Sequence, residues 1–145
     1  MIEKDKRYLA NKGKIIKDAL ADDKVNVIVV NGDTGMGKTT LLKYIRDTAV
    51  FPNIQTIEFD NIIRDKVSEY EVSLTDRKDT LFLLDEYPNT VITNLTTEIR
   101  KIRKHGNKII VFSHRKASIM EDLDRLANMV IELRREGDFH IEANE

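Results

Sequence analysis

Cysteine is absent from this 145-residue sequence, which excludes disulfide bonds, thiolate metal sites and a cysteine nucleophile. Proline is scarce too, and the two prolines, Pro52 and Pro88, both fall in predicted connections between elements. No apolar run approaches the roughly 20 residues that a membrane-spanning helix needs. The first residues also lack the apolar core of a secretory signal. These absences predict a cytoplasmic protein with no membrane partner.

An excess of charge of one sign is missing as well. The 24 basic and 25 acidic residues give a formal net charge of −1, so the chain as a whole does not attract nucleic acid. Any such contact would have to come from a local patch. A hydrophobic share of 41% and a charged share of 34% are typical of a globular domain with a solvated surface. We expect one domain over residues 1–145, with an N-terminal helical extension over residues 1–23.

Short apolar runs alternate with helical patterns along the chain. Strands are predicted over residues 25–30, 54–59, 81–84, 109–112 and 129–133, the last paired with 139–142 in a closing β-hairpin. Helices are predicted over residues 3–21, 40–48 and 92–102, and Ser118 with Glu121 forms the capping box of another. Gly13 counts against the first helix, and Gly106 is placed as a C-terminal cap. The alternation predicts a three-layer α/β/α fold with a parallel core sheet.

A glycine-rich stretch directly follows the first predicted strand. Residues 32–39 match the pattern G-x-x-x-x-G-K-[ST] of a phosphate-binding loop. Glycines there let backbone N–H groups point at the phosphates, and the following helix adds its dipole. Lys38 would reach the β- and γ-phosphates, and Thr39 would offer its hydroxyl to Mg²⁺. The predicted nucleotide-binding residues are Gly32, Asp33, Thr34, Gly35, Met36, Gly37, Lys38, Thr39 and Thr40.

The alternative explanation of this stretch is a chance glycine turn with a surface lysine. It is disfavoured because the stretch lies between a predicted buried strand and a predicted helix, which is the context that confirms the pattern. The sequence therefore predicts that the chain binds a nucleoside triphosphate with magnesium.

Two carboxylates end the third predicted strand. Asp85 and Glu86 follow the apolar run 81–84, at the edge of the sheet where ligands of open α/β folds bind. Asp85 would hold Mg²⁺ directly or through water, and Glu86 would activate the water that attacks the γ-phosphate. A strand end followed by the polar turn at residues 87–89 is the alternative. Together with the phosphate loop, the pair predicts a site of phosphoryl transfer.

The fourth predicted strand ends in Ser113, His114 and Arg115. If this strand lies between the other two, its polar end faces the γ-phosphate, where a hydroxyl or imidazole could sense the nucleotide or orient the water. Ser113 is predicted to have this catalytic role. For His114, an ordinary exposed histidine explains the sequence equally well.

A basic cluster lies on and just after the helix predicted over residues 92–102. Its members are Arg100, Lys101, Arg103, Lys104, His105 and Lys108. Such a run is usually a solvated face. The alternatives are contacts to DNA phosphates, or an arginine, Arg100 or Arg103, supplied to the site of a neighbouring subunit. No aromatic residues interleave with these charges, so base stacking on the cluster is not expected.

The two nucleotide motifs resemble those of P-loop NTPases of the additional-strand type, which carry a catalytic glutamate after the second motif. Residues 32–39 match the first motif and residues 81–86 the second. Within that class, residues 100–115 resemble the HerA/FtsK group of DNA translocases, conjugative coupling proteins and viral genome-packaging ATPases. His114 stands where that group usually has glutamine.

The resemblance implies a core sheet with the strand order 2-3-4-1-5. It also implies hydrolysis of ATP with Mg²⁺, coupled to work on a macromolecule, with DNA translocation or packaging as the expected activity. DNA would bind through Arg100, Lys101, Arg103 and Lys104. A homo-oligomer, such as a hexamer, is expected because one subunit's arginine completes its neighbour's site in these motors. A viral member of the group would act in the host cytoplasm.

Two other functions stay open at this stage. Small size and balanced charge favour a slow nucleotide-dependent switch that binds a protein partner. A small-molecule phosphotransferase is disfavoured because no arginine-rich lid is evident and Glu86 suits attack by water. The chain has no Leu-Ser-Gly-Gly-Gln stretch of transport ATPases, and no Asn-Lys-x-Asp stretch that reads guanine, which favours ATP.

Overall fold

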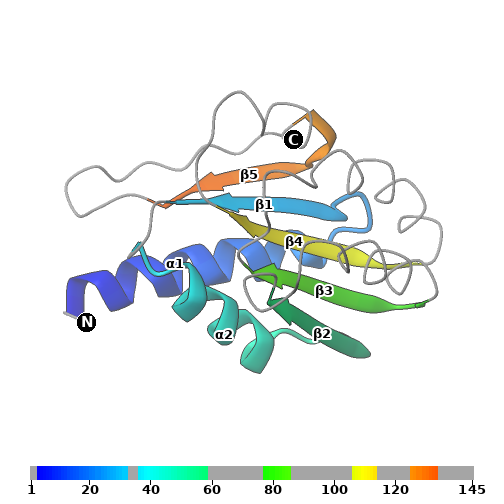
Figure 1. The fold of residues 1–145 in the computed structure, drawn as a ribbon, viewed down its shortest axis with the longest axis horizontal. Coiled ribbons are helices and arrows are strands. Elements are labelled where there is room, and N and C mark those ends of the chain that lie inside the picture. Colours follow the sequence, from blue (N-terminus) through cyan, green and yellow to red (C-terminus); the bar gives the residue numbers. More distant parts are fainter. Residues whose placement is uncertain (1–2, 33–35, 59–76, 86–105, 114–124, 134–145) are drawn as a thin grey trace.

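The structure, a computed structural model, describes residues 3–32, 36–58, 77–85, 106–113 and 125–133 (Figure 1). Its helices are α1 (Glu3–Leu20) and α2 (Lys38–Thr48). Its strands are β1 (Val27–Asn31), β2 (Asn53–Glu58), β3 (Thr80–Asp85), β4 (Lys108–Ser113) and β5 (Met129–Glu132). Within these ranges, neither helix has the length and apolar character needed to span a bilayer.

The strands form one parallel sheet in the order β2-β3-β4-β1-β5. β1 lies inside the sheet, where Val29 pairs with Val111 of β4 on one side and with Val130 of β5 on the other. Because all strands run the same way, the C-terminal ends of β1, β3 and β4 meet at one edge. The order is the one that the resemblance implied, so that prediction is confirmed.

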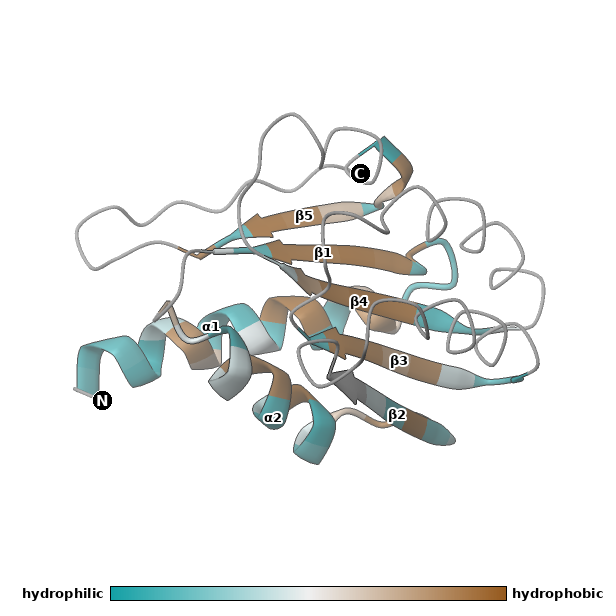
Figure 2. Ribbon diagram, in the orientation of Figure 1, coloured by the Kyte–Doolittle hydropathy of each residue, from teal (hydrophilic) through white to brown (hydrophobic). Residues whose placement is uncertain are grey.

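Strands β1, β3, β4 and β5 are buried on both faces, and most of their residues are apolar (Figure 2). One set of alternating residues joins a core with α1 and α2; it includes Ile28, Val30, Leu81, Leu83, Ile110 and Phe112. The residues between them point to the other face and are just as buried, among them Val27, Val29, Phe82, Leu84, Ile109 and Val111. Burial on both faces is typical of a parallel sheet covered by two layers, as predicted.

α1 and α2 lie side by side and run in the same direction, since their first halves line one pocket and their last residues line another. Gly13 makes their close contact possible, because a Cβ atom at this position would overlap the ring of Tyr44. The glycine that counted against the helix in the sequence therefore lies where the two helices are in close contact. The predicted helix over residues 3–21 is confirmed.

Lys108 connects the end of α1 to β4. Its Nζ donates hydrogen bonds to the carbonyl oxygens of Leu20, at 2.6 Å, and Asp22, at 2.8 Å. A lysine at the last carbonyls of a helix also complements the negative end of the helix dipole. Burial lowers the pKa of Lys108, and the charges of Asp23 and Asp22 oppose that lowering. This member of the predicted basic cluster thus caps a helix.

The predicted strands are confirmed, with shifts at their ends. β1 begins at Val27 instead of residue 25, and β2 covers Asn53–Glu58 instead of 54–59. Gly106 has a φ of 70°, the left-handed conformation that a C-terminal cap requires. The helix predicted over residues 92–102, the capping box of Ser118 and strand 139–142 of the predicted hairpin lie outside the described residues.

Candidate functional site

The predicted phosphate loop, residues 32–39, joins the end of β1 to the start of α2. Gly37 precedes α2 with φ 92° and ψ 19°, a left-handed conformation that glycine adopts without strain. A Cβ atom on Gly37 would also lie 2.7 Å from Cδ1 of Leu9 in α1. Both the backbone conformation and the close approach of α1 therefore require glycine here. Asp33, Thr34 and Gly35 lie outside the described residues.

Lys38 is the first residue of α2, and only 4% of it is exposed. Its Nζ donates a 2.6 Å hydrogen bond to the carbonyl oxygen of Gly32. This bond spans the loop from one end to the other. It holds the ammonium group beside the loop backbone, where a phosphate bound by the loop would meet it.

The first turn of α2 has the features of an anion site. Gly37 offers no side chain as a cap, and the turn contains no acidic residue. The N–H groups of a first turn lack carbonyl partners within the helix and carry the positive end of its dipole. Thr39 and Thr40 are exposed in the same turn. These groups can bind a phosphate, with Lys38 adding a full positive charge.

Neighbouring strands hold the beginning of the loop from both sides. The N–H of Gly32 donates to the carbonyl oxygen of Ser113 at 3.2 Å, and the N–H of Leu133 donates to that of Asn31 at 2.8 Å. A Cβ atom on Gly32 would lie 3.2 Å from Cβ of Leu133 and 3.4 Å from Cβ of Met36. The loop therefore starts from a tightly packed position between β4 and the end of β5.

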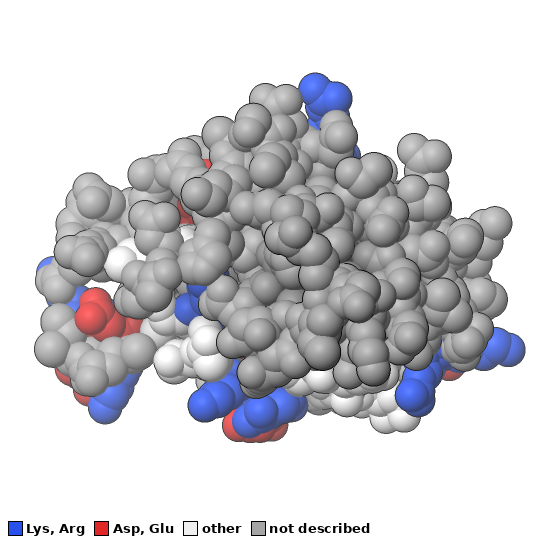
Figure 3. All heavy atoms as spheres, in the orientation of Figure 1, with Lys and Arg blue, Asp and Glu red and all other residues white. Residues whose placement is uncertain are grey.

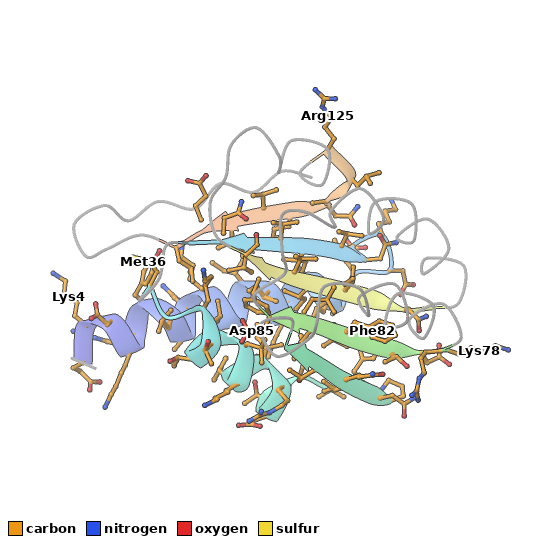
Figure 4. All side chains as sticks on the ribbon, in the orientation of Figure 1. Lys4, Met36, Lys78, Phe82, Asp85 and Arg125 are labelled. Carbon is orange, nitrogen blue, oxygen red and sulfur yellow. The ribbon has the colours of Figure 1, made fainter. Side chains whose placement is uncertain are left out.

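Asp85 is the last residue of β3 and is 5% exposed. α2 packs against β3, and Figure 4 shows Asp85 at the end of that strand. Since Leu84 pairs with Val111 of β4, Asp85 belongs to the same sheet edge as the phosphate loop. Carboxylate and hydroxyl oxygens are ligands that Mg²⁺ accepts, so Asp85 and Thr39 could hold this ion.

A protein-only metal site is not present among the described residues, which contain no group of three or more histidines, aspartates and glutamates suited to a metal. Mg²⁺ is commonly held by one or two protein oxygens together with the phosphates of its nucleotide. The donor set of Asp85 and Thr39 fits that arrangement.

Ser113 ends β4, between the strands that carry Asp85 and the phosphate loop. It is completely buried, and its Oγ donates a 3.1 Å hydrogen bond to Oδ1 of Asn31. Asn31 is 3% exposed and directly precedes Gly32. The hydroxyl of Ser113 is thus connected to the residue from which the phosphate loop starts.

The other predicted site residues lie outside the described residues. These are Glu86, His114, Arg115 and the basic residues Arg100, Lys101, Arg103 and Lys104. The structure therefore brings together the two ends of the phosphate loop, Asp85 and Ser113 at one edge of the sheet.

Solved structures with a similar arrangement support this description of the fold. C. elegans PCH-2 matches with a TM-score of 0.53 and 20% identity over 91% of this chain and 41% of its own. A RuvB variant from Thermotoga maritima matches with a TM-score of 0.55 and 17% identity, over 92% of this chain and 45% of its own. Pif1 from Bacteroides sp, solved with ADP-AlF4, has a TM-score of 0.51 and 18% identity over 88% of this chain and 42% of its own.

The fold is that of a P-loop NTPase. At 17–20% identity these likenesses show the fold alone. The chain spans less than half the length of each of these proteins. Neither a scan against protein-family models nor a search of curated proteins found a match.

Three residues around the P-loop were not identified as part of the site in the sequence. Leu9 packs on Gly37, Asn31 accepts the hydrogen bond from Ser113, and Leu133 packs on Gly32. Leu9 and Leu133 looked like ordinary core residues, because helix or strand periodicity does not say which distant segment a side chain will meet. Asn31 did carry a signal, since it is a polar residue at the end of an otherwise apolar strand directly before the loop.

Proposed function

We propose that this chain binds Mg-ATP through its phosphate loop and hydrolyses it, and that hydrolysis drives work on a macromolecule, with DNA as the expected substrate. The observation that carries the proposal is the pairing of Gly37 and Lys38. The glycine takes the left-handed conformation just before α2, and the lysine extends back across the loop to Gly32. This backbone and this ammonium group suit a chain of phosphates.

Each residue of the proposed site would then have one task. The Nζ of Lys38 would exchange the carbonyl oxygen of Gly32 for oxygens of the β- and γ-phosphates, and the first turn of α2 would donate N–H groups to them. Thr39 and Asp85 would hold the metal ion. Mg²⁺ bound with the nucleotide would neutralise charge that develops on the phosphates. Glu86 would orient and deprotonate the attacking water.

Ser113 would act at the β4 end as a sensor. Its hydrogen bond to Asn31 fixes the hydroxyl next to the start of the loop, so a shift of the loop on phosphate release would change that bond. The segment after β4 would receive this change. Such a connection is what a motor needs between hydrolysis and movement.

DNA as the substrate is supported by the basic residues from Arg100 to Lys104 and by the likeness to Pif1, which is described as a helicase. A nucleotide-dependent regulator is the second candidate. It is favoured by the net charge of −1. It is also favoured by the described side chains on the face that Figure 3 shows, where Lys and Arg lie next to Asp and Glu.

The test is phosphate release from Mg-ATP, measured alone and with single-stranded or double-stranded DNA, for the wild type and for Glu86→Gln. We expect turnover that rises with DNA. The variant should bind nucleotide normally and hydrolyse it roughly 10²–10⁴-fold more slowly, which is the usual contribution of a positioned general base.

Each alternative has its own result in this assay. Turnover that does not respond to DNA would favour the regulator. Hydrolysis at the wild-type rate in Glu86→Gln would show that Glu86 is not the base. No binding of Mg-ATP to the wild type would refute the proposal as a whole.

A further inference from the structure

A small pocket lies between α1 and α2 on the side of the phosphate loop. Its volume is about 180 Å³, and it is lined by Lys6, Leu9, Ala10, Thr40, Leu41 and Tyr44. We call it the α1–α2 pocket. None of these residues except Thr40 belongs to the predicted nucleotide site.

The pocket shares its wall with the loop. Leu9 lines the pocket and also lies against Gly37, where an added Cβ atom would be 2.7 Å from its Cδ1. Thr40 lines the pocket and is the residue after Thr39. If the phosphates of a ligand lie on the first turn of α2, the other end of that ligand could therefore reach this pocket.

The chemistry of the lining suits a flat apolar group. Four of the six lining residues, Leu9, Ala10, Leu41 and Tyr44, are apolar or aromatic, and the other two are Lys6 and Thr40. Pockets for drug-sized ligands measure roughly 300–1,000 Å³, so this one would take only part of a ligand and leave the rest outside. The purine ring of a nucleotide is such a part, because the ribose and the phosphates joined to it would stay outside the pocket.

The Tyr44 wall is also held in place before any ligand arrives. Its ring packs against Gly13 of α1, and the ammonium group of Lys17 lies 4.8 Å from the ring centroid. A ring fixed in this way loses little freedom when a ligand packs against it, which favours binding.

We propose that the α1–α2 pocket receives the base of the nucleotide, so that α1 is part of the nucleotide site. The proposal rests on the proposed function, since it presupposes that the loop binds the phosphates. Because four of the six described lining residues, Leu9, Ala10, Leu41 and Tyr44, offer carbon surface, we expect packing to hold the base more than hydrogen bonds to its edge. Such a pocket discriminates weakly between ligands of similar shape. Adenine and guanine nucleotides should thus bind with similar affinity.

The first test needs no variant. Calorimetric titration of the wild type compares Mg-ATP, Mg-GTP and magnesium tripolyphosphate, which has phosphates and no base. We expect both nucleotides to bind roughly tenfold or more tighter than tripolyphosphate, the effect of packing one base against an aromatic side chain. The two nucleotides should differ from each other by less than about tenfold.

The second test fills the pocket from its exposed side with Ala10→Phe. Ala21→Phe is the matched control, because Ala21 is also exposed and lines a pocket between the ends of the same helices, away from the loop. Ala10→Phe should weaken both nucleotides roughly tenfold or more and leave tripolyphosphate unchanged. Ala21→Phe should change none of the three affinities.

Equal affinity of the wild type for ATP and tripolyphosphate would overturn this inference while leaving the proposed function intact. Equal losses for all three ligands in Ala10→Phe, or no loss, would overturn it too. If one of the two purine nucleotides bound 100-fold or more tightly than the other, packing alone would not explain how the base is recognised. If the wild type bound none of the three ligands, the proposed function would fail together with the inference.

Discussion

Lys38 occupies a position where a positive charge is expensive unless a negative group is near. It is 4% exposed at the positive end of the α2 dipole, and its Nζ donates to the carbonyl oxygen of Gly32. A bound phosphate would compensate both costs. This arrangement explains why the loop and the lysine occur together, and it leads to a prediction for the lysine.

Lys38→Ala should weaken binding of Mg-ATP by about 10- to 100-fold or abolish it, because hydrogen bonds to charged groups contribute roughly 1.5–3 kcal/mol. Calorimetric titration measures the change. Lys43→Ala, at an exposed position of the same helix, is the control and should bind as the wild type does. Unchanged affinity in Lys38→Ala would remove the phosphate-loop interpretation.

Lys12 is the other lysine that is buried in the described part of the chain. It is 1% exposed, its Nζ lies 4.9 Å from the centroid of the Tyr8 ring, and burial lowers its pKa from 10.5 to about 8. When the folded state lowers the pKa of a lysine, burial of its charge lowers the free energy of unfolding. This penalty has its full size at pH values below the lowered pKa. The penalty shrinks as the pH rises from about 8 to 10.5, because the folded state releases the proton first.

Lys12→Met should therefore raise the melting temperature at pH 7, by at least about 3 °C if the gain is ~1 kcal/mol or more. The difference from the wild type should become smaller as the pH is raised toward 10. Lys14→Met, exposed on the same helix, should show no such pH-dependent gain. A gain in Lys12→Met that is the same at both pH values would show that charge is not its cause.

At the level of single residues, the sequence predicted the residues that belong to a motif. It missed the residues whose place in the site depends on a tertiary contact. Gly37 and Lys38 were predicted because a short pattern already specifies their backbone and charge. Leu9 was missed because its contact with Gly37 joins α1 to the loop across the segment that contains β1.

Among the elements, the contact between α1 and α2 depends on one small residue. A Cβ atom at Gly13 would overlap the ring of Tyr44, although alanine favours a helix by about 1 kcal/mol over glycine. Overpacking typically costs 1–3 kcal/mol. We expect Gly13→Ala to lower the free energy of unfolding by about 1 kcal/mol in chemical denaturation.

A double-mutant cycle separates these two effects. With Tyr44→Ala as the background, the obstructing ring is gone, so Gly13→Ala should stabilise the protein through its helix propensity. A loss of stability of the same size in both backgrounds would mean that the contact with Tyr44 is not the cause.

The elements themselves were predictable because the core strands are short, apolar and buried on both faces, which gives a clear sequence pattern. The ends of these strands were less predictable. Asn31, Thr80, Asp85 and Ser113 are polar, yet each belongs to a strand and is buried. The strand order was not visible in the residues and came from the resemblance, because pairing of strands far apart in sequence has no local signature.

For the molecule as a whole, the ends of three strands meet at one edge of the sheet only because the order of the sheet places β4 between β1 and β3. A ligand that binds this edge binds only the folded state, so it should stabilise the entire domain. At a concentration 100 times its dissociation constant, Mg-ATP should contribute about 2.7 kcal/mol. At this chain length, that corresponds to a rise in melting temperature of roughly 8 °C.

Asp85→Asn separates the part of this stabilisation that depends on magnesium. In the variant, the melting temperature with ATP plus Mg²⁺ should equal that with ATP plus a chelator. The smaller rise in melting temperature that ATP alone produces through the loop should remain. Asp79→Asn makes the same exchange just before the other end of β3, and asparagine tolerates the positive φ of 51° found there. This control should keep the full magnesium effect. If Asp85→Asn kept it as well, the ion would have to be held without this carboxylate, and β3 would contribute to the site through residues beyond Asp85.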